Sequence, residues 1–373
     1  MSKAAELAKW GEVSTNGQVS GRRNIIINGA FQIAQRGTSH TGLTNGSNGY
    51  YLDRFKFAES GTSGATYTIT QATDGPSGFG NSMKFDCTTA DTSLGAEEQL
   101  RIISDYEGLD LQQLKKGTSD AEKVTLSFYV KSNLTGTAIV TIYDTPNSRH
   151  ISKSYTIDSA NTWERKTLTF DGDTSGAIDN DNTTGFRIEW HLTAGANATS
   201  GTLATSWAGF TAANQAVGQT INLATSTDNN FFITGVQMEV GSQATPFEHR
   251  SYGEELALCQ RYYTVVAHGA AAQDGTSHPI SMGAVYTSST LYANLELPCD
   301  MRTTPTLEIV SATNYYTFYR NGGGDSVDDF ALTKWGTRVL EFYNNSDISG
   351  TAGHSGFIRT ANSAAKFALT AEL

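Results

Sequence analysis

The sequence predicts an all-β protein made of two antiparallel sandwich domains, with a short N-terminal helix and a short linker helix between the domains. Composition is the first reason, since the 373 residues include 37 Gly and only 6 Pro, with 38% hydrophobic, 10% aromatic and 17% charged residues. Such a composition suits many short strands joined by turns. The second reason is period-two alternation of apolar and polar residues, which is typical of half-buried antiparallel strands. No strand–helix alternation occurs, which excludes a parallel sheet and a dinucleotide-binding fold.

The first 23 residues are predicted to form a separate segment. Residues 3–10 fit about two helical turns, and a glycine-containing polar connector follows them. A helix this short is marginal alone in water, so it needs a surface to dock against. One hypothesis makes residues 1–23 a particle-attachment segment in which Leu7 and Trp10 dock, and the other makes them a frayed terminus.

Residues 24–250 are predicted to form the larger sandwich. In its clearest strand, Val124, Leu126, Phe128 and Val130 share one face, as alternate residues of a strand must. About ten such strands with turns between them indicate a sandwich. The expected strands cover residues 24–33, 53–58, 66–72, 82–85, 97–103, 123–131, 137–143, 149–157, 162–170, 184–192 and 230–240.

A short helix over residues 253–263 is predicted to link the domains, because Leu256, Cys259 and Tyr263 recur at helical spacing. Residues 251–373 are predicted to form the smaller β-sandwich. The glycine run 322–324 predicts a mobile loop within it. The expected strands cover residues 262–267, 281–286, 291–297, 306–310, 315–319, 338–343 and 367–373.

Charge and cysteine content narrow the possible partners. The formal net charge is −11, and its scattered acidic residues repel phosphate backbones, so no nucleic-acid partner is expected. No window approaches the roughly 18 apolar residues that span a bilayer, so no membrane insertion is expected. The start has no apolar core typical of a secretion signal. Three widely spaced cysteines indicate neither a zinc site nor a disulfide framework, so we expect synthesis in a reducing cytosol.

Four sequence motifs of the larger domain carry a resemblance. They are NIIINGAF at 24–31, FYVKS at 128–132, TWE at 162–164 and FFITGVQME at 231–239. Their order resembles the jelly-roll carbohydrate-binding modules, whose first and last strands pair and carry similar words. The resemblance implies that the larger domain is a jelly-roll sandwich.

Further words resemble a more specific group of proteins. They are AELA at 5–8, QRG at 35–37, LDRF at 52–55, VGSQATPFEHR at 240–250, LCQRYY at 258–263 and MRTTPT at 301–306. Together they look like the fibre and appendage proteins of tailed bacteriophages, especially of cyanophages and other phages with marine hosts. These words are specific to the architecture and say little about the target.

This resemblance implies a non-enzymatic structural component of the virion, made in the host cytoplasm. It would be a tail fibre or similar appendage that attaches to glycan on the host surface. One alternative is a capsid-decorating head fibre or cement protein, and another is a glycan-cleaving appendage enzyme. The resemblance also implies a homotrimer, and other virion proteins as partners of the N-terminal segment.

Metal binding and catalysis have little support in the residues. Jelly-roll modules often carry a structural calcium, which makes Asp53 and Glu239 the calcium candidates that the resemblance implies; no other cofactor is expected. The seven histidines show no metal-binding spacing, and no nucleophile elbow or Walker loop occurs. Distant carboxylates can still form a glycosidase pair, so hydrolysis stays open.

Aromatic residues are the remaining candidates for recognition. In the second domain, the loop 319–329 offers Asp325 as an acceptor for sugar hydroxyls, with Tyr315, Tyr316 and Trp335 as stacking faces for a receptor. The alternative is a mobile hairpin with no ligand. In the larger domain, Trp207 and Phe210 stand in a polar stretch, where they contact a partner or fold back onto the sandwich.

Two positions near the domain ends have structural interpretations. Asn28-Gly29 predicts a bulge or turn in which a positive φ is tolerated. Glu248 and Arg250 are expected to be solvated at the junction between the domains.

Overall fold

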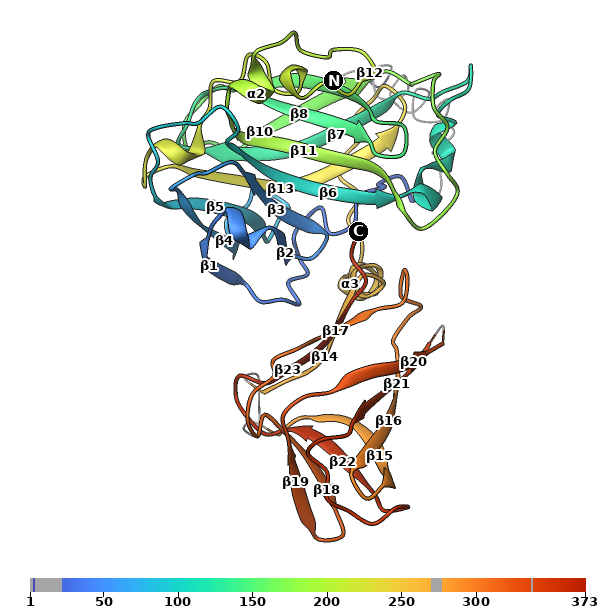
Figure 1. The fold of residues 1–373 in the computed structure, drawn as a ribbon. Helices are drawn as coiled ribbons and strands as arrows, with labels where there is room; N and C mark the ends of the chain where they lie inside the picture. The colour runs from blue at the N-terminus through green and yellow to red at the C-terminus, as the bar shows by residue number, and fades with distance from the viewer. Residues whose placement is uncertain (1–2, 4–21, 270–276, 337) are drawn as a thin grey trace. The chain divides into compact units, whose positions relative to one another are not determined.

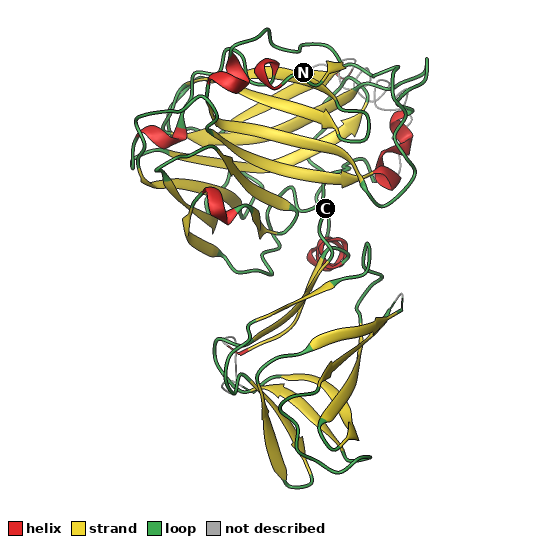
Figure 2. Cartoon of the chain, viewed as in Figure 1, coloured by secondary structure: helices red, strands yellow, loops and turns green. Residues whose placement is uncertain are grey.

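The computed structural model describes Lys3 and residues 22–269, 277–336 and 338–373. The chain divides into two compact units, one ending at Glu255 and the other covering Leu256–Glu372. This division falls within helix α3 (Tyr252–Gln260), inside the helix predicted over 253–263. Both units consist of antiparallel sheets with short helices between some strands, which confirms the prediction of an all-β protein (Figure 2).

The first unit is a sandwich of two antiparallel sheets (Figure 1). Its six-stranded sheet has the order β1 (Ser39–Leu43), β4 (Thr66–Ala72), β5 (Ser82–Thr89), β13 (Asn230–Val240), β7 (Val124–Ser132) and β10 (Glu164–Phe170). Its seven-stranded sheet has the order β12 (Ala208–Gly209), β9 (Arg149–Ile157), β8 (Gly136–Asp144), β11 (Thr184–Ala194), β6 (Gln99–Glu107), β3 (Phe55–Ser60) and β2 (Gly49–Leu52). The short helices are η1 (Asn45–Ser47), η2 (Gly108–Leu114), α2 (Ala196–Thr199), η3 (Ala212–Asn214) and η4 (Leu223–Thr225).

The core of the first unit lies between its two sheets. Phe128 on β7 of one sheet lies 6.0 Å, ring to ring, from Trp190 on β11 of the other. Both side chains are fully buried, and burial of a side chain this large contributes about 1.5–3 kcal/mol. Val124, Leu126 and Val130 are buried with Phe128, so the predicted inward face of this strand is confirmed.

The segment 24–33 is not a strand, contrary to the prediction. Asn28 and Phe31 have φ values of 60° and 51°, outside the extended region of a regular strand, and the predicted turn at Asn28 is confirmed. Side chains take the place of ladder partners: Asn24 Oδ1 accepts from the Ile26 N–H at 3.0 Å, and Asn28 Oδ1 from the Ile33 N–H at 3.0 Å. The apolar run resembles a strand, but its neighbouring asparagines satisfy the backbone locally.

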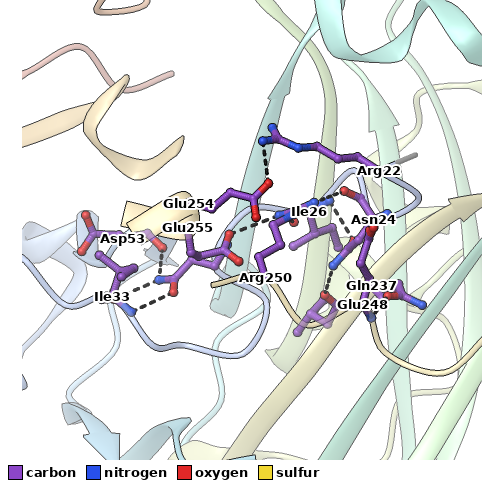
Figure 3. A network of polar contacts seen from close by, with 12 residues as sticks. Arg22, Asn24, Ile26, Ile33, Asp53, Gln237, Glu248, Arg250, Glu254 and Glu255 are labelled. Atoms are coloured by element: carbon purple, nitrogen blue, oxygen red, sulfur yellow. Dashed lines mark hydrogen bonds and ion pairs between the residues drawn. The ribbon is translucent and has the colours of Figure 1, made fainter. Parts of the chain in front are cut away.

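Three charged side chains fasten this segment (Figure 3). Glu248 Oε2 accepts from the Asn24 N–H at 2.7 Å, and Glu255 Oε1 accepts from the Asn28 N–H at 2.6 Å. Arg250 donates to the Asn24 carbonyl and lies 3.2 Å from Glu255 Oε1. The prediction that Glu248 and Arg250 are solvated is therefore wrong, because backbone groups without ladder partners engage them.

The second unit also has two sheets. The three-stranded sheet has the order β14 (Tyr263–His268), β23 (Lys366–Thr370) and β17 (Thr306–Ile309). The seven-stranded sheet has the order β19 (Gly323–Val327), β18 (Tyr316–Arg320), β22 (Ser355–Thr360), β15 (Pro279–Thr287), β16 (Thr290–Glu296), β21 (Val339–Asn344) and β20 (Ala331–Trp335). Phe367 and Phe342, from opposite sheets, lie 5.0 Å apart between ring centres, so the core again lies between the sheets.

The glycine run 322–324 does not form a mobile loop, contrary to the prediction. Gly322 has a φ of 77° in a tight turn, and Gly323 and Gly324 begin β19, which pairs with β18. A Cβ at Gly324 would lie 2.9 Å from Thr317 Cγ2, so the missing side chain allows close packing of the hairpin.

Within the described residues, no helix has the length and apolar character needed to cross a membrane.

Candidate functional site

The outer face of the seven-stranded sheet of the first unit carries a row of charges. Along β11, Ile188 and Trp190 point into the core, so the alternating residues Arg187, Glu189 and His191 point outward. Figure 1 shows β8, β11 and β6 side by side across this sheet. This face is therefore polar across its centre.

Two ion pairs lie on this face, and we call their four residues the charge ladder. Arg187 Nε lies 2.8 Å from Asp105 Oδ1, and Arg101 Nη1 lies 3.3 Å from Glu189 Oε1. Burial opposes ionisation of Glu189, but the nearby cations, Arg101 first, outweigh it and hold the pKa of this carboxyl below its usual value. Both carboxylates of the charge ladder are buried and paired, an arrangement typical of structural ion pairs.

Two histidines share this face and are neutral at neutral pH. Burial lowers the pKa of His191 to about 4 and also lowers the pKa of His150. His191 Nε2 and Thr141 Oγ1 share a hydrogen bond of 3.1 Å, while Phe210 packs 5.3 Å from the His150 ring. Both imidazoles act here as packed side chains, and neither adds a charge to the face.

The stretch that contains Trp207 and Phe210 folds back onto the sandwich. Trp207 stacks on Phe186 at 5.7 Å and donates to the Asp171 carbonyl at 2.7 Å. Gln215 Nε2 lies 3.3 Å from Glu189 Oε2, which links the stretch to the charge ladder. Of the two predicted alternatives, folding back is the one observed, although Phe210 keeps 42% of its surface exposed.

The second unit carries a different surface, formed by large apolar side chains on the outer face of its seven-stranded sheet. We call it the aromatic row, and its members are Tyr319 on β18, Phe357 on β22, Met282 and Tyr286 on β15, Tyr292 on β16 and Tyr343 on β21. Register pairing places them on one face: Phe357 lies opposite both Tyr319 and Met282, and Tyr292 lies opposite Tyr343. Four of the six are among the most exposed large apolar side chains described, from 46% at Tyr319 to 72% at Tyr286. Contiguous exposure of this kind marks an interaction surface.

One cation lies within the aromatic row. The Arg359 guanidinium carbon is 5.6 Å from the ring centres of both Tyr319 and Phe357. Cation–π contacts of this geometry orient the guanidinium against the rings. At the other end of the sheet, Glu341 and Lys334 stand opposite each other on β21 and β20. The face thus combines stacking surfaces with separated charges.

The structure places the predicted receptor residues in different environments. Tyr316 is fully buried and donates to the Lys366 carbonyl at 2.7 Å, so the prediction that it stacks on a ligand is wrong. Burial raises the pKa of its hydroxyl to about 12. Asp325 accepts from Arg320 at 2.6 Å, and Tyr315 is half-buried against the core. Trp335 is 60% exposed at the edge strand β20, so a ligand contact by it stays a prediction.

The alternation on β18 is what separates Tyr316 from Tyr319. The two residues point to opposite faces, and the sequence shows aromatic residues at 315, 316, 318 and 319 without indicating which are inward. Phe357 and Arg359 were not predicted as site residues. On β22 the apolar residues Phe357 and Ile358 are adjacent and point to opposite faces, so both faces of the strand carry an apolar residue. The spacing of Met282 and Tyr286 on the predicted strand 281–286 was the available signal.

The calcium candidates accept hydrogen bonds from separate protein donors. Asp53 accepts from the Gln35 N–H at 2.8 Å and from Gln35 Nε2 at 2.7 Å. Glu239 Oε2 accepts from the Thr245 N–H at 3.0 Å. Within the ranges that the structure describes, no group of three or more His, Cys, Asp or Glu side chains is arranged to hold a metal ion, and calcium binding stays a prediction. Leu7 and Trp10 lie outside the described residues.

No protein-family model and no curated protein matches this sequence. Among solved structures, the chain is similar to the enzymatically active domain of tailspike protein 4 from bacteriophage CBA120, at 12% identity, 58% coverage of this chain and a TM-score of 0.30. It spans about a fifth of that structure, 21% of its length. It is also similar to a family 11 carbohydrate-binding module of a Clostridium thermocellum cellulase, at 15% identity, coverage of 57% and 98%, and a TM-score of 0.27. A family 61 module in complex with β-1,4-galactotriose matches at 10% identity, coverage of 59% and 99%, and a TM-score of 0.27. At these TM-scores the likeness is partial, so the proposed function depends on this chain's own residues.

Proposed function

We propose that this chain is a non-catalytic structural component of a tailed-phage virion, a tail fibre or similar appendage that attaches to glycan on the host surface. The observation that carries the attachment role is the aromatic row on the second unit. Aromatic faces stack on the C–H faces of sugar rings, and their exposure without a covering segment in the described residues leaves them free to do so.

The virion role rests on the sequence words that resemble phage fibres and appendages. In this proposal, residues 1–23 dock into the parent particle through Leu7 and Trp10, and three chains associate into one appendage. The protein is then made in the host cytoplasm and resides in the assembled virion.

Binding rather than hydrolysis fits the two carboxylates of the charge ladder. A glycosidase needs one carboxyl group that can donate a proton and one that is free to act on the sugar or on water. Asp105 and Glu189 are each held by an arginine, and the pKa of Glu189 is lowered rather than raised. These two groups are therefore poorly suited to acid catalysis.

The test uses labelled full-length protein and host cells. We expect saturable binding that is lost when the surface polysaccharide is stripped from the cells. The same polysaccharide, added in solution, should compete with the binding of the protein to intact cells. Incubation of the same polysaccharide with the protein should leave its chain length unchanged. Shorter products would support a glycan-cleaving enzyme, and binding that survives removal of the polysaccharide would contradict glycan attachment.

A further inference from the structure

In the part of the chain that the structure describes, Arg359 lacks the carboxylate partner that several other arginines have. Arg187, Arg149 and Arg320 each have a carboxylate oxygen within 2.8 Å. In contrast, the contacts of Arg359 within the described residues are its two aromatic neighbours, and no carboxylate pairs with it. A guanidinium ordinarily binds carboxylate or phosphate through its planar fork of N–H donors.

The position of this cation is defined by the sheet. Arg359 and Phe357 are alternate residues of β22, so both point outward, while Ile358 between them is buried. Tyr319 on the neighbouring strand lies opposite Phe357. The guanidinium is therefore held between two exposed rings, with its remaining donors available to a ligand that lies on those rings.

The length of the aromatic row fits an extended chain molecule. From Tyr319 to Tyr343 the row crosses β18, β22, β15, β16 and β21. With a strand spacing of about 4.8 Å, these five strands extend over about 19 Å, enough for several sugar rings in succession.

We propose that the aromatic row binds an acidic polysaccharide that contains uronic acids, with Arg359 pairing with a carboxylate of the sugar. This inference rests on the proposed glycan attachment and names its ligand class. The chain has a net charge of −11, and an unpaired cation among stacking surfaces provides local charge complementarity to an acidic ligand. Glu341 lies on β21, toward the other end of the row, so the carboxylate of the sugar is expected to lie at the Tyr319–Phe357 end, beside Arg359.

The test measures affinity of the full chain for polygalacturonate, alginate and hyaluronate, with neutral dextran and dextran sulfate for comparison. We expect the uronic-acid polymers to bind at least tenfold more tightly than dextran, with affinity that falls as salt is added. Arg359→Gln should remove this preference without weakening any dextran binding. Arg338→Gln is the matched control, because Arg338 is exposed in the same unit but lies 3.8 Å from Asp300 and away from the row.

Each outcome decides the question. Equal affinity for neutral and acidic polymers, or an unchanged preference in Arg359→Gln, would overturn the acidic ligand and leave glycan attachment standing. Tighter binding of dextran sulfate than of every uronic-acid polymer would also overturn it. Absence of binding to any of these polymers would overturn it as well; self-association that Phe357→Ala abolishes would then identify a second copy of the chain as the occupant. Failure of the proposed function itself is recognised separately, by cell binding that survives removal of the surface polysaccharide.

Discussion

His191 is a buried neutral imidazole, and its burial makes the stability of the first unit depend on pH. The pKa of His191 falls from 6.5 to about 4 on folding, so the unfolded chain binds its proton first as the pH falls. The contribution of neutral His191 to the free energy of unfolding is fully present above pH 6.5. It decreases by up to about 3 kcal/mol as the pH falls toward 4. Urea denaturation should measure the free energy of unfolding above pH 6.5 and near pH 4. Between these two pH values it should decrease less for His191→Gln than for the unaltered chain. Equal decreases would contradict this assignment.

Glu59 on β3 has the opposite pH dependence. Burial, with repulsion from Glu98 and Asp91, outweighs a hydrogen bond from Ser63 and raises the pKa of Glu59 from 4.5 to about 7. The folded protein therefore retains a proton that the unfolded chain loses, and stability falls as the pH rises from 4.5 through 7. Glu59→Gln should be more stable than the unaltered chain at pH 8 and should lose most of this advantage at pH 4.5. A variant that is less stable at both pH values would contradict the prediction.

At the scale of elements, the segment 24–33 depends on close approach to β13. Val236 donates its N–H to the Gly29 carbonyl at 2.9 Å, and a Cβ at Gly29 would lie 2.0 Å from the Val236 carbonyl oxygen. Gly29→Ala should therefore cost about 2 kcal/mol or more of unfolding free energy, measured by urea denaturation. Gly80→Ala is the control, since a Cβ there meets nothing within 4 Å and should change stability little. Equal effects of both substitutions would contradict the packing argument.

Some elements could be predicted from the sequence, and others could not. The strands 66–72 and 149–157 were predicted with the bounds of β4 and β9, because turn residues bracket them and their alternation is regular. The segment 24–33 was misassigned because its apolar run satisfies the strand pattern. Its backbone N–H groups donate partly to its own asparagines and partly to the distant carboxylates of Glu248 and Glu255. Partners more than 220 positions away, such as these, leave no local signal.

The candidate site was predictable only in part. The sequence indicated the second domain and its aromatic residues, and Trp335 is indeed exposed. It did not distinguish inward Tyr316 from outward Tyr319, because one residue of register reverses every side chain of a strand. Phe357 and Arg359 come from a strand that was not predicted, so the aromatic row exists only after five strands pair.

At the scale of the whole molecule, we predict a homotrimer. Among the residues that the structure describes, the sheets of both units end in edge strands with no further partner, such as β1, β10 and β20, and association covers edges of this kind. Sedimentation equilibrium should give about three times the 40.0 kDa of one chain. A stable 40.0 kDa monomer at micromolar concentration would contradict the prediction.

The N-terminal segment gives a second prediction at this scale. Deletion of residues 1–23 should abolish incorporation of the protein into virions, because the proposed docking residues Leu7 and Trp10 are removed. Urea unfolding should show that the deleted protein still folds, since the described sheets begin after this segment, although the contacts of Arg22 with Glu254 and of Arg23 with Glu248 are lost. Particles that still carry the deleted protein would reduce residues 1–23 to a terminus without a docking role.

The central claim is that the aromatic row attaches the chain to host glycan. The most direct measurement compares binding of labelled full-length variants to host cells. The double variant Tyr319→Ala/Phe357→Ala should bind roughly tenfold or more weakly, because two exposed stacking faces are lost while the buried core of the unit is untouched. Tyr252→Ala removes an aromatic residue that is 60% exposed outside the row, and should bind as the unaltered chain does. Unchanged binding of the double variant, most decisively if Phe210→Ala weakens binding instead, would contradict the account.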